Sequence, residues 1–474
     1  MEEHTEIIDE VLTDIAAYVT ERTISSPEAY RMAQWVLADT LGAGILALND
    51  RQCRKLLGPL IPGTAVAGGC RVPGLAFELD PVQAAFNIGC MNRWLDYNDT
   101  WLAREWGHPS DNIGAILAVA DWKSRQNIRD GKPPLPMREV LTAIIKAHEI
   151  QGVLSLGNSL NRVGLDHVLF VKVASTAVAT HLLGGTYDQV VNALSQAWLD
   201  NGSLRTYRHG ADTGSRKSWA AGDATSRAVR LALLALTHEM GYPRALSAPD
   251  WGFNAVVMRD QAIHLAQPLD SYVIEHVLFK LFPAEFHGQT AVEAALELHP
   301  AVTARWDDID RVVVRTQESA MRIINKRGPL KNPADRDHCI QYMTAVALIH
   351  GDLSAEHYDE ATAADGRIEA LREKMTVEED PQFSRDYLDP AKRSVGNTLQ
   401  VYFRDGSKTP QVTVEYPLGH HRRRQEAERH IWHKCETNLS SWFVPAKVDE
   451  LLSLLRRDTL DSVPVPEFLD AWRP

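Results

Sequence analysis

The chain has few cysteines and none of the common nucleotide, metal or hydrolase motifs. Its five cysteines are scattered over 474 residues without a C-x-x-C pair, at Cys53, Cys70, Cys90, Cys339 and Cys435. Zinc sites and iron–sulfur clusters usually need closely spaced thiolates, so no metal and no cofactor of this kind is expected. The Walker A, G-x-S-x-G and H-E-x-x-H patterns are also missing, which argues against P-loop, serine-hydrolase and zinc-protease chemistry.

Long apolar runs and an excess of basic residues are missing too. No stretch approaches the roughly 20 apolar residues that span a bilayer, so no membrane partner is expected. The first residues are acidic and lack the basic segment of a signal peptide, which favours a cytoplasmic protein. The formal net charge of -12 makes nucleic acid an unfavourable partner. A site for an acidic molecule would therefore need cations that are concentrated locally.

Apolar periodicity and capping residues predict helices through most of the first two thirds of the chain. Ser26-Pro27 begins a helix whose apolar pattern continues to about Leu48. Asp80-Pro81 begins another, with an acid at the N-cap and proline at the first helical position. The first part of the chain is therefore expected to be mainly helical.

The pattern changes from about Tyr272 onwards. Residues 310–316 resemble a strand, and residues 397–417 predict a hairpin around Asp405-Gly406. Helical patterns lie between these two, at residues 288–299, 336–350 and 366–374. A smaller α+β unit is therefore expected, and the helices after it can pack back on the first part, which would make the α+β unit an insertion.

The junction at residues 94–114, WLDYNDTWLAREWGHPSDNIG, is unusually rich in acids and aromatics for a helix-to-helix loop. Asp96 and Thr100 are four residues apart, so they share a face if the preceding helix extends that far. His108 precedes a proline and lies beside the start of the next helix, which Ser110 or Asp111 can cap. Free backbone N–H groups at such a helix start favour anions. Capping and loop stabilisation alone would also account for these residues.

Two later helix starts have a similar composition. Asp166 can cap a helix that runs to Gly184-Gly185, which places His167 in its first turn. Lys217 lies near another helix start, where the helix dipole disfavours a cation by about 0.3–1 kcal/mol, so a nearby anion is expected. Five potential cations lie within 13 residues of this acidic chain: Arg205, Arg208, His209, Arg216 and Lys217. A solvated surface run is the alternative interpretation of these cations.

Histidine, aspartate, lysine and arginine without a metal or nucleotide motif indicate acid–base chemistry on a small anion. Removing a proton next to a carboxylate requires a positioned base and cations that stabilise the enediolate-like charge. If the neighbouring carbon carries a hydroxyl, an acid that protonates it completes a dehydration. The residue pattern alone leads no further than this.

Several long strings resemble the MmgE/PrpD family, and the likeness extends over nearly the whole chain: RWLDYNDTWLAREWGHPSDNIGAILA, NRVGLDHVLFVKVASTAV, SLRTYRHGADTGSRKSWAAGDATSRAVRLAL, FPAEFHGQTAVEAA and NPADRDHCIQYM. The resemblance implies a mainly α fold, in which a large all-helical domain from residues 1–271 and 418–474 carries an inserted α+β lid at 272–417. It also implies a homodimer without a cofactor, with the site between helical domain and lid. The implied reaction eliminates water from the tricarboxylate 2-methylcitrate to give 2-methyl-cis-aconitate in propionate breakdown, and some members act on citrate or its isomers.

The resemblance also implies site residues. The D-x-x-D-T pattern places an active-site acid and a threonine, and the H-P-S pattern places a histidine. The implied catalytic residues are His108, Asp96, Lys217 and His167. The resemblance implies Thr100, Lys280 and Tyr342 as substrate-binding residues. The local concentration of cations adds Arg205, Arg208, His209 and Arg216, and the segment that joins the two regions adds His287.

One position departs from the related cis-aconitate decarboxylases. They have a histidine soon after F-P-A, where this chain has Glu285, with His287 two residues later. The difference favours a dehydratase over a decarboxylase. A decarboxylase or epimerase of the same family, or a carboxylate-binding protein without activity, remain the alternatives.

Overall fold

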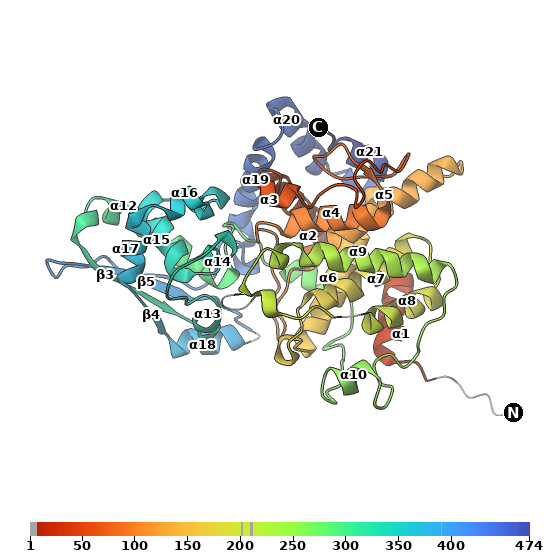
Figure 1. Cartoon of the computed structure of the whole chain (residues 1–474), viewed down its shortest axis with the longest axis horizontal. Helices are drawn as coiled ribbons and strands as arrows, with labels where there is room; N and C mark the ends of the chain where they lie inside the picture. The colour runs from red at the N-terminus through yellow and green to blue at the C-terminus, as the bar shows by residue number, and fades with distance from the viewer. Residues whose placement is uncertain (1–6, 201, 209–211, 390) are drawn as a thin grey trace.

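The computed structural model describes residues 7–200, 202–208, 212–389 and 391–474, and the chain is mainly helical, as expected (Figure 1). Buried apolar side chains form two large cores. The larger core takes its residues from positions 11–279 and 427–472, so it contains both ends of the described chain. The second core takes its residues from positions 284–412 and lies at the left of Figure 1.

Helices build the larger core, and its only strands in the described ranges form a two-stranded antiparallel pair. Its principal helices are α1 (Glu10–Glu21), α2 (Pro27–Ala47), α4 (Pro81–Arg93), α5 (Ile113–Arg129), α6 (Met137–Gly157), α7 (Val168–Leu182), α8 (Tyr187–Leu199), α9 (Arg216–Leu236), α19 (Arg424–Ser440), α20 (Pro445–Leu455) and α21 (Val465–Asp470). Short helices α3 (Arg51–Arg54), α10 (Phe253–Val256) and α11 (Tyr272–His276) lie between them, and the strands are β1 (Cys70–Arg71) and β2 (Glu78–Leu79). Among the described residues, no helix is both long enough and apolar enough to cross a bilayer.

Local capping accounts for the helix starts that were predicted correctly. The Ser26 side chain accepts a hydrogen bond from the Ala29 N–H at the start of α2. The Asp80 carboxylate accepts from the N–H groups of Val82 and Gln83 at the start of α4. These bonds satisfy backbone donors that the first helical turn leaves free. Both predicted helices are confirmed.

Two other capping predictions were wrong. Asp166 does not cap α7, because the N-cap residue is His167 and no side chain bonds there. Neither Ser110 nor Asp111 caps α5, because both lie in a 3-10 helix, Pro109–Asn112, that precedes it. Their side chains bond instead to the 96–100 loop, where Asn98 donates to both Ser110 and Asp111. Tertiary hydrogen bonds have taken the place of local capping.

Helices α4 and α9 approach very closely at glycine, and this contact makes a testable prediction. A Cβ added to Gly222 would lie 2.6 Å from the Phe86 carbonyl oxygen and 2.8 Å from the Cys90 nitrogen, both backbone atoms. Gly222→Ala should therefore lower the free energy of unfolding by about 1–3 kcal/mol through overpacking, although alanine favours a helix by about 1 kcal/mol. The matched control is Gly366→Ala in helix α17 (Gly366–Glu373), where nothing lies within 4 Å of the added carbon. Chemical denaturation of both variants tests this, and equal stability of the two would contradict it.

A four-stranded sheet and several helices build the second core. The strand order is β4-β3-β5-β6, with β3 and β4 parallel and the other pairs antiparallel. The strands are β3 (Ile309–Thr316), β4 (Met375–Glu379), β5 (Asn397–Phe403) and β6 (Val412–Val414). The helices are α12 (Gln289–Thr303), α13 (Glu318–Ile323), α14 (Pro333–Arg336), α15 (Ile340–His350), α16 (Glu360–Ala363), α17 and α18 (Pro381–Leu388).

The sequence patterns in this region are confirmed with one omission. The strand at 310–316, the hairpin around Asp405-Gly406 and the three helical patterns correspond to β3, β5–β6, α12, α15 and α17. Strand β4 was not predicted. It pairs in parallel with β3, more than 50 residues earlier, and short parallel strands of this kind have no turn signal beside them.

Candidate active site

A cavity of about 820 Å³ lies between the two cores, and residues from both of them line it. The larger core and the segment that leaves it contribute Arg93, Asp96, Thr100, His108, His167, Arg205, Arg208 and Lys280. The second core contributes Glu285, His287, Arg322, Lys326, Arg327, Lys331, Asp335 and His338. Eight lining residues are Lys or Arg and three are Asp or Glu, in a chain whose net charge is -12. The cavity is thus a local concentration of cations.

Asp96 lies in the wall of this cavity, but not on a helix. Helix α4 ends at Arg93, and Asp96 has a left-handed φ of 52°, a region in which Asp and Asn are found more often than most residues. The expectation that Asp96 and Thr100 share a helix face was therefore wrong. The left-handed turn aims the Asp96 carboxylate at two cations, Arg93 at 2.5 Å and Lys280.

The charge state of Asp96 follows from these neighbours. Burial opposes ionisation of the carboxyl group, but Arg93, Lys280 and Lys217 outweigh it and hold the pKa of Asp96 well below its usual range. Lys280 also donates to the Asp96 backbone oxygen at 2.9 Å. Burial lowers the pKa of Lys280, while Asp96 raises it in part. The pair therefore consists of a carboxylate and an ammonium ion that loses its proton more readily than an exposed lysine.

His108 is buried beside Asp96 with both ring nitrogens engaged. Nδ1 lies 2.6 Å from the Asp99 backbone oxygen and Nε2 lies 2.8 Å from Arg93 Nη2. Because a carbonyl only accepts and a guanidinium only donates, Nδ1 carries the proton and Nε2 accepts. Burial, Arg93 and Lys280 hold the pKa of His108 well below its usual value. Thr100 Oγ1 lies 3.2 Å from Nδ1.

His167 occupies the neighbouring part of the wall and packs edge-on against His108, with ring centroids 5.5 Å apart. Its Nδ1 lies 2.7 Å from Asp166 Oδ1. Burial opposes ionisation of Asp166, but Arg208 and His167 hold its pKa well below the usual range. Arg205 lies 3.5 Å from a Glu105 oxygen and 4.0 Å from Asp166. The arginines of this wall are therefore paired with buried carboxylates.

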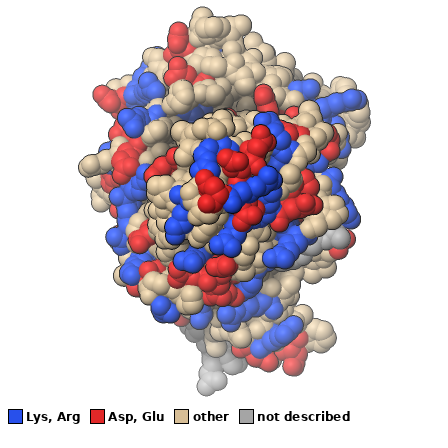
Figure 2. Space-filling view, turned by 90° about the vertical axis from the view of Figure 1, so that its left-hand side faces the viewer, with Lys and Arg blue, Asp and Glu red and all other residues tan. Residues whose placement is uncertain are grey.

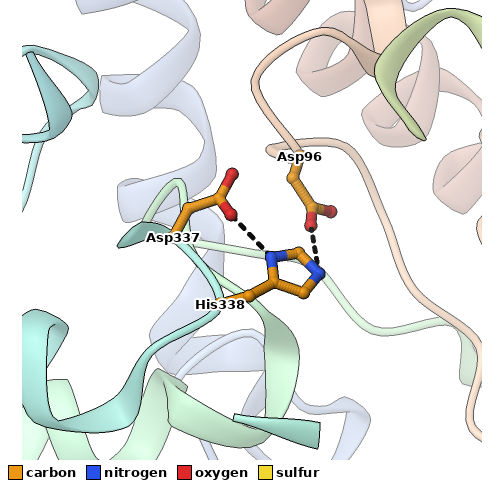
Figure 3. A group of neighbouring side chains, drawn as sticks. All are labelled: Asp96, Asp337 and His338. Atoms are coloured by element: carbon orange, nitrogen blue, oxygen red, sulfur yellow. Dashed lines mark hydrogen bonds and ion pairs between the residues drawn. The ribbon is translucent and has the colours of Figure 1, made fainter. Parts of the chain in front are cut away.

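Lys217, in the first turn of α9, connects the larger core to the second core. Its Nζ lies 2.9 Å from each carboxylate oxygen of Asp337, so the anion expected near Lys217 is a side chain of the protein. Asp337 Oδ1 lies 2.6 Å from Nδ1 of His338, whose Nε2 lies 3.8 Å from Asp96 Oδ2 (Figure 3). Burial opposes ionisation of Asp337, but Lys217 and His338 lower its pKa. Asp96, Lys217, Asp337 and His338 thus form one network across the two cores.

The structure places most, but not all, of the expected residues at the cavity. Lys217 does not line it and instead contacts Asp337. Arg216 points into a different hollow, where it pairs with Asp223 at 3.1 Å and stacks on Trp219. Tyr342 donates to the His357 backbone oxygen at 2.7 Å inside the second core and does not line the cavity. His209 lies outside the described residues.

His287 lines the cavity but is engaged on both sides. Its Nδ1 lies 2.8 Å from Glu285 Oε1 and its Nε2 lies 3.1 Å from the Tyr387 hydroxyl. Burial opposes ionisation of Glu285, but His287 outweighs it and lowers the pKa of the carboxyl group. Glu285 and His287 therefore act as one hydrogen-bonded unit in the wall.

Sequence reasoning missed several residues of this cavity. Arg93, Asp337 and His338 were included only as parts of family strings. The cations of α13 and the loop after it were not singled out: Arg322, Lys326, Arg327 and Lys331. The only signal was the adjacent Asp-His pair in NPADRDHCIQYM, because an acid beside a histidine often orients it.

Asp96, Asp337 and His338 also bring three potential metal ligands within 4.8 Å of one another (Figure 3). Their surroundings do not suit a divalent cation. Lys280 and Lys217 already contact the two carboxylates, and Arg93 contacts Asp96 as well. Three cations would repel a metal ion from the donors, so the donor set fits protein cations better than a metal.

Comparison with known proteins gives a consistent result over nearly the whole chain. The model of the MmgE/PrpD N-terminal domain matches residues 13–266, and that of the MmgE/PrpD C-terminal domain matches residues 282–457. The 2-methylcitrate dehydratase of Escherichia coli K12 is 56% identical, over 98% of this chain and 97% of its own length. The mitochondrial 2-methylcitrate dehydratase of Yarrowia lipolytica is 49% identical, over 98% of this chain and 90% of its own length.

Proposed function

The chain belongs to the MmgE/PrpD family, and we propose that it is a hydro-lyase that eliminates water from 2-methylcitrate. The product is 2-methyl-cis-aconitate. The observation that supports this function is the cavity around Asp96, which is lined by eight Lys or Arg residues and only three acids. A substrate with three carboxylates matches that excess of positive charge.

The cations at the mouth of the cavity are the ones free to bind the substrate. Arg93, Lys280, Arg205 and Arg208 are each paired with buried acids in the wall. Among the described residues, Arg327 and Lys331 line the cavity, are exposed, and have no ion-pair partner. These two side chains therefore bind substrate carboxylates. On the outer face of the second core, by contrast, acidic and basic residues are intermingled (Figure 2).

This assignment predicts a binding defect without a chemical one. The double variant Arg327→Gln, Lys331→Gln should raise KM for 2-methylcitrate about 10-fold, because charged hydrogen bonds contribute about 1.5–3 kcal/mol and these groups are solvent-exposed. The value of kcat should stay within about 3-fold. Added salt should raise KM less in the variant than in the wild type, because fewer exposed charges remain to be screened. Steady-state kinetics at two salt concentrations measure both effects.

The control is Arg315→Gln, an exposed arginine of β3 that pairs with Glu378 at 3.6 Å and does not line the cavity. It should leave both kinetic constants unchanged. An unchanged KM in the double variant would remove Arg327 and Lys331 from the substrate site.

The elimination requires a base for a carbon-bound proton and an acid for the departing hydroxyl group. The proton is lost from the carbon that carries the methyl group and a carboxylate, so nearby cations must stabilise the developing negative charge. We assign the acid to Lys280, because burial lowers its pKa and its ammonium group faces the cavity. Asp96 holds that ammonium group, and His108 and His167 line the same wall. Lys217 does not line the cavity and acts through Asp337.

A substrate screen tests the function directly. Purified protein is offered 2-methylcitrate stereoisomers, citrate, isocitrate and cis-aconitate, and ultraviolet absorbance reports the conjugated alkene. We expect the largest rise with a 2-methylcitrate isomer. Carbon dioxide release from cis-aconitate, without alkene from 2-methylcitrate, would indicate a decarboxylase instead. Thermal stabilisation by citrate without any turnover would indicate a binding protein.

The family membership supports further features. We propose that a lid within residues 272–417 is inserted into a helical domain built from both ends of the chain. The second core, at positions 284–412, supports this arrangement, whereas Ile274, Val277 and Phe279 belong to the larger core. We propose that the enzyme acts as a cytoplasmic homodimer in propionate breakdown. Exposed apolar side chains such as Trp251, 85% exposed, and Met240, 61% exposed, are available for a subunit contact.

We also propose that the enzyme needs no iron–sulfur cluster. All five cysteines are buried. Burial raises the pKa of Cys339, and raises that of Cys435 to about 12. Buried thiols of this kind are poor sources of the thiolates that ligate iron.

A further inference from the structure

Two imidazoles approach Asp96, and they differ in whether a ring nitrogen is free. His108 Nε2 lies 4.0 Å from Asp96 Oδ1, and His338 Nε2 lies 3.8 Å from Asp96 Oδ2. The first comes from the loop after α4 and the second from the loop before α15. A base that removes a carbon-bound proton needs an unshared electron pair that faces the substrate.

His108 does not offer such a pair. Its Nδ1 carries the proton that goes to the Asp99 oxygen, and its Nε2 accepts from Arg93 Nη2 at 2.8 Å. To accept a substrate proton, the ring would have to break the bond to Arg93. It would then be a third cation beside Arg93 and Lys280. His108 is therefore suited to holding Arg93 and the loop in place.

His338 has the opposite arrangement. The Asp337 carboxylate accepts the Nδ1 proton at 2.6 Å, and Lys217 holds that carboxylate through both oxygens at 2.9 Å. Lys217 also lies 3.3 Å from Nδ1, but its contacts with Asp337 are shorter. This bond leaves the lone pair on Nε2, in a ring that lines the cavity. Among the described residues, no hydrogen bond is made to Nε2, and Asp96 is beyond hydrogen-bond distance.

The neighbours of His338 also suit the charge that it would acquire. A protonated ring would lie between two carboxylates, Asp337 at 2.6 Å and Asp96 at 3.8 Å (Figure 3). Before the reaction, burial and Lys217 lower the pKa of His338, which keeps the ring neutral and able to accept a proton. An acid that orients a histidine, which in turn faces the reacting atom, is a recurrent arrangement of catalytic bases.

From this geometry we infer that His338 is the base that removes the proton from 2-methylcitrate, with Asp337 and Lys217 as its positioning residues. This inference rests on the proposed dehydratase function. The proton moves from the methyl-bearing carbon to His338 Nε2, and the electrons of that C–H bond form the double bond. The C–O bond breaks, and its electron pair leaves with the hydroxyl group. That group takes a proton from the Lys280 ammonium ion and departs as water.

Chemical rescue separates this role from a structural one. His338→Ala should lower kcat by about 10²- to 10⁴-fold, the usual contribution of a general base. Added imidazole should restore part of the activity in proportion to its concentration, because the cavity is open to solvent. Affinity for propane-1,2,3-tricarboxylate, which has the three carboxylates but no hydroxyl group, should stay within about 3-fold. Calorimetry measures that affinity, and His338→Gln replaces the alanine variant if the latter does not fold.

Two further variants complete the design. His108→Ala should also lose activity, but imidazole should not restore it, because the missing group positions Arg93 rather than the proton. His350→Gln, at the exposed end of α15, should behave like the wild type. Rescue of His108→Ala alone, or turnover by His338→Gln within about 5-fold of the wild type, would overturn the assignment. Wild-type protein that is inactive on 2-methylcitrate would instead refute the proposed function.

Discussion

Asp96→Asn is expected to lower kcat for water elimination by about 10³-fold, within the range of a lost general acid–base or electrostatic contribution. The carboxylate contacts Arg93 at 2.5 Å and also Lys280, and its oxygens face two imidazoles. Without the negative charge of Asp96, burial would lower the pKa of Lys280 further, because Asp96 is the largest influence that raises that pKa. The lysine would then hold less firmly the proton that the departing hydroxyl group needs.

The substitution should change chemistry more than structure. Asparagine, like aspartate, tolerates the left-handed φ of 52° at this position, so the turn should survive. Alkene absorbance measures turnover, and circular dichroism measures folding. Asp310→Asn, an exposed acid of β3, serves as the control. Retention of more than a tenth of the wild-type kcat by Asp96→Asn would exclude an essential role for the charge.

Lys434→Met is expected to destabilise the protein by about 3–5 kcal/mol, the usual result of leaving one member of a buried ion pair alone. Lys434, on the returning helix α19, lies 2.7 Å from Asp39 Oδ1 in the larger core. It also donates to the Tyr97 oxygen at 2.7 Å and to the Lys280 oxygen at 2.8 Å. One carbonyl belongs to Tyr97, the residue after Asp96, and the other to Lys280 itself. Catalytic activity should therefore fall together with stability.

The size of this effect should depend on pH. Burial raises the pKa of Asp39 to about 6, even though Lys434 lowers it, whereas an unfolded aspartate titrates near about 3.9. A raised folded pKa means that stability falls as pH rises through that range, because the folded state must give up a proton. Removing Lys434 raises the folded pKa further, so the loss of stability should be larger at pH 8 than at pH 5.

Denaturant unfolding at both pH values measures this difference. The double variant Asp39→Asn, Lys434→Met removes the unpaired charge and should recover much of the lost stability. Equal losses at the two pH values, or no recovery in the double variant, would show that the pair is not the source of the effect.

Local physics made several features of this protein predictable. Ser26 and Asp80 begin helices because their side chains satisfy backbone N–H groups within three residues, and Asp405-Gly406 turns a hairpin by its own backbone preferences. The long family strings also predicted the family, which the matches to the MmgE/PrpD N- and C-terminal domains confirm. Each of these signals lies within a short segment or within one string.

Only the tertiary structure decided how the catalytic wall is assembled. The sequence by itself predicted an acid–base site for an anion that includes Asp96, His108 and Lys217. It did not determine that α4 ends before Asp96, that the partner of Lys217 is Asp337, or that His338 has the free nitrogen. Lys217 and Asp337 are 120 residues apart. Such contacts depend on how the two cores pack together. No local periodicity or capping pattern predicts a contact between residues so far apart in the sequence.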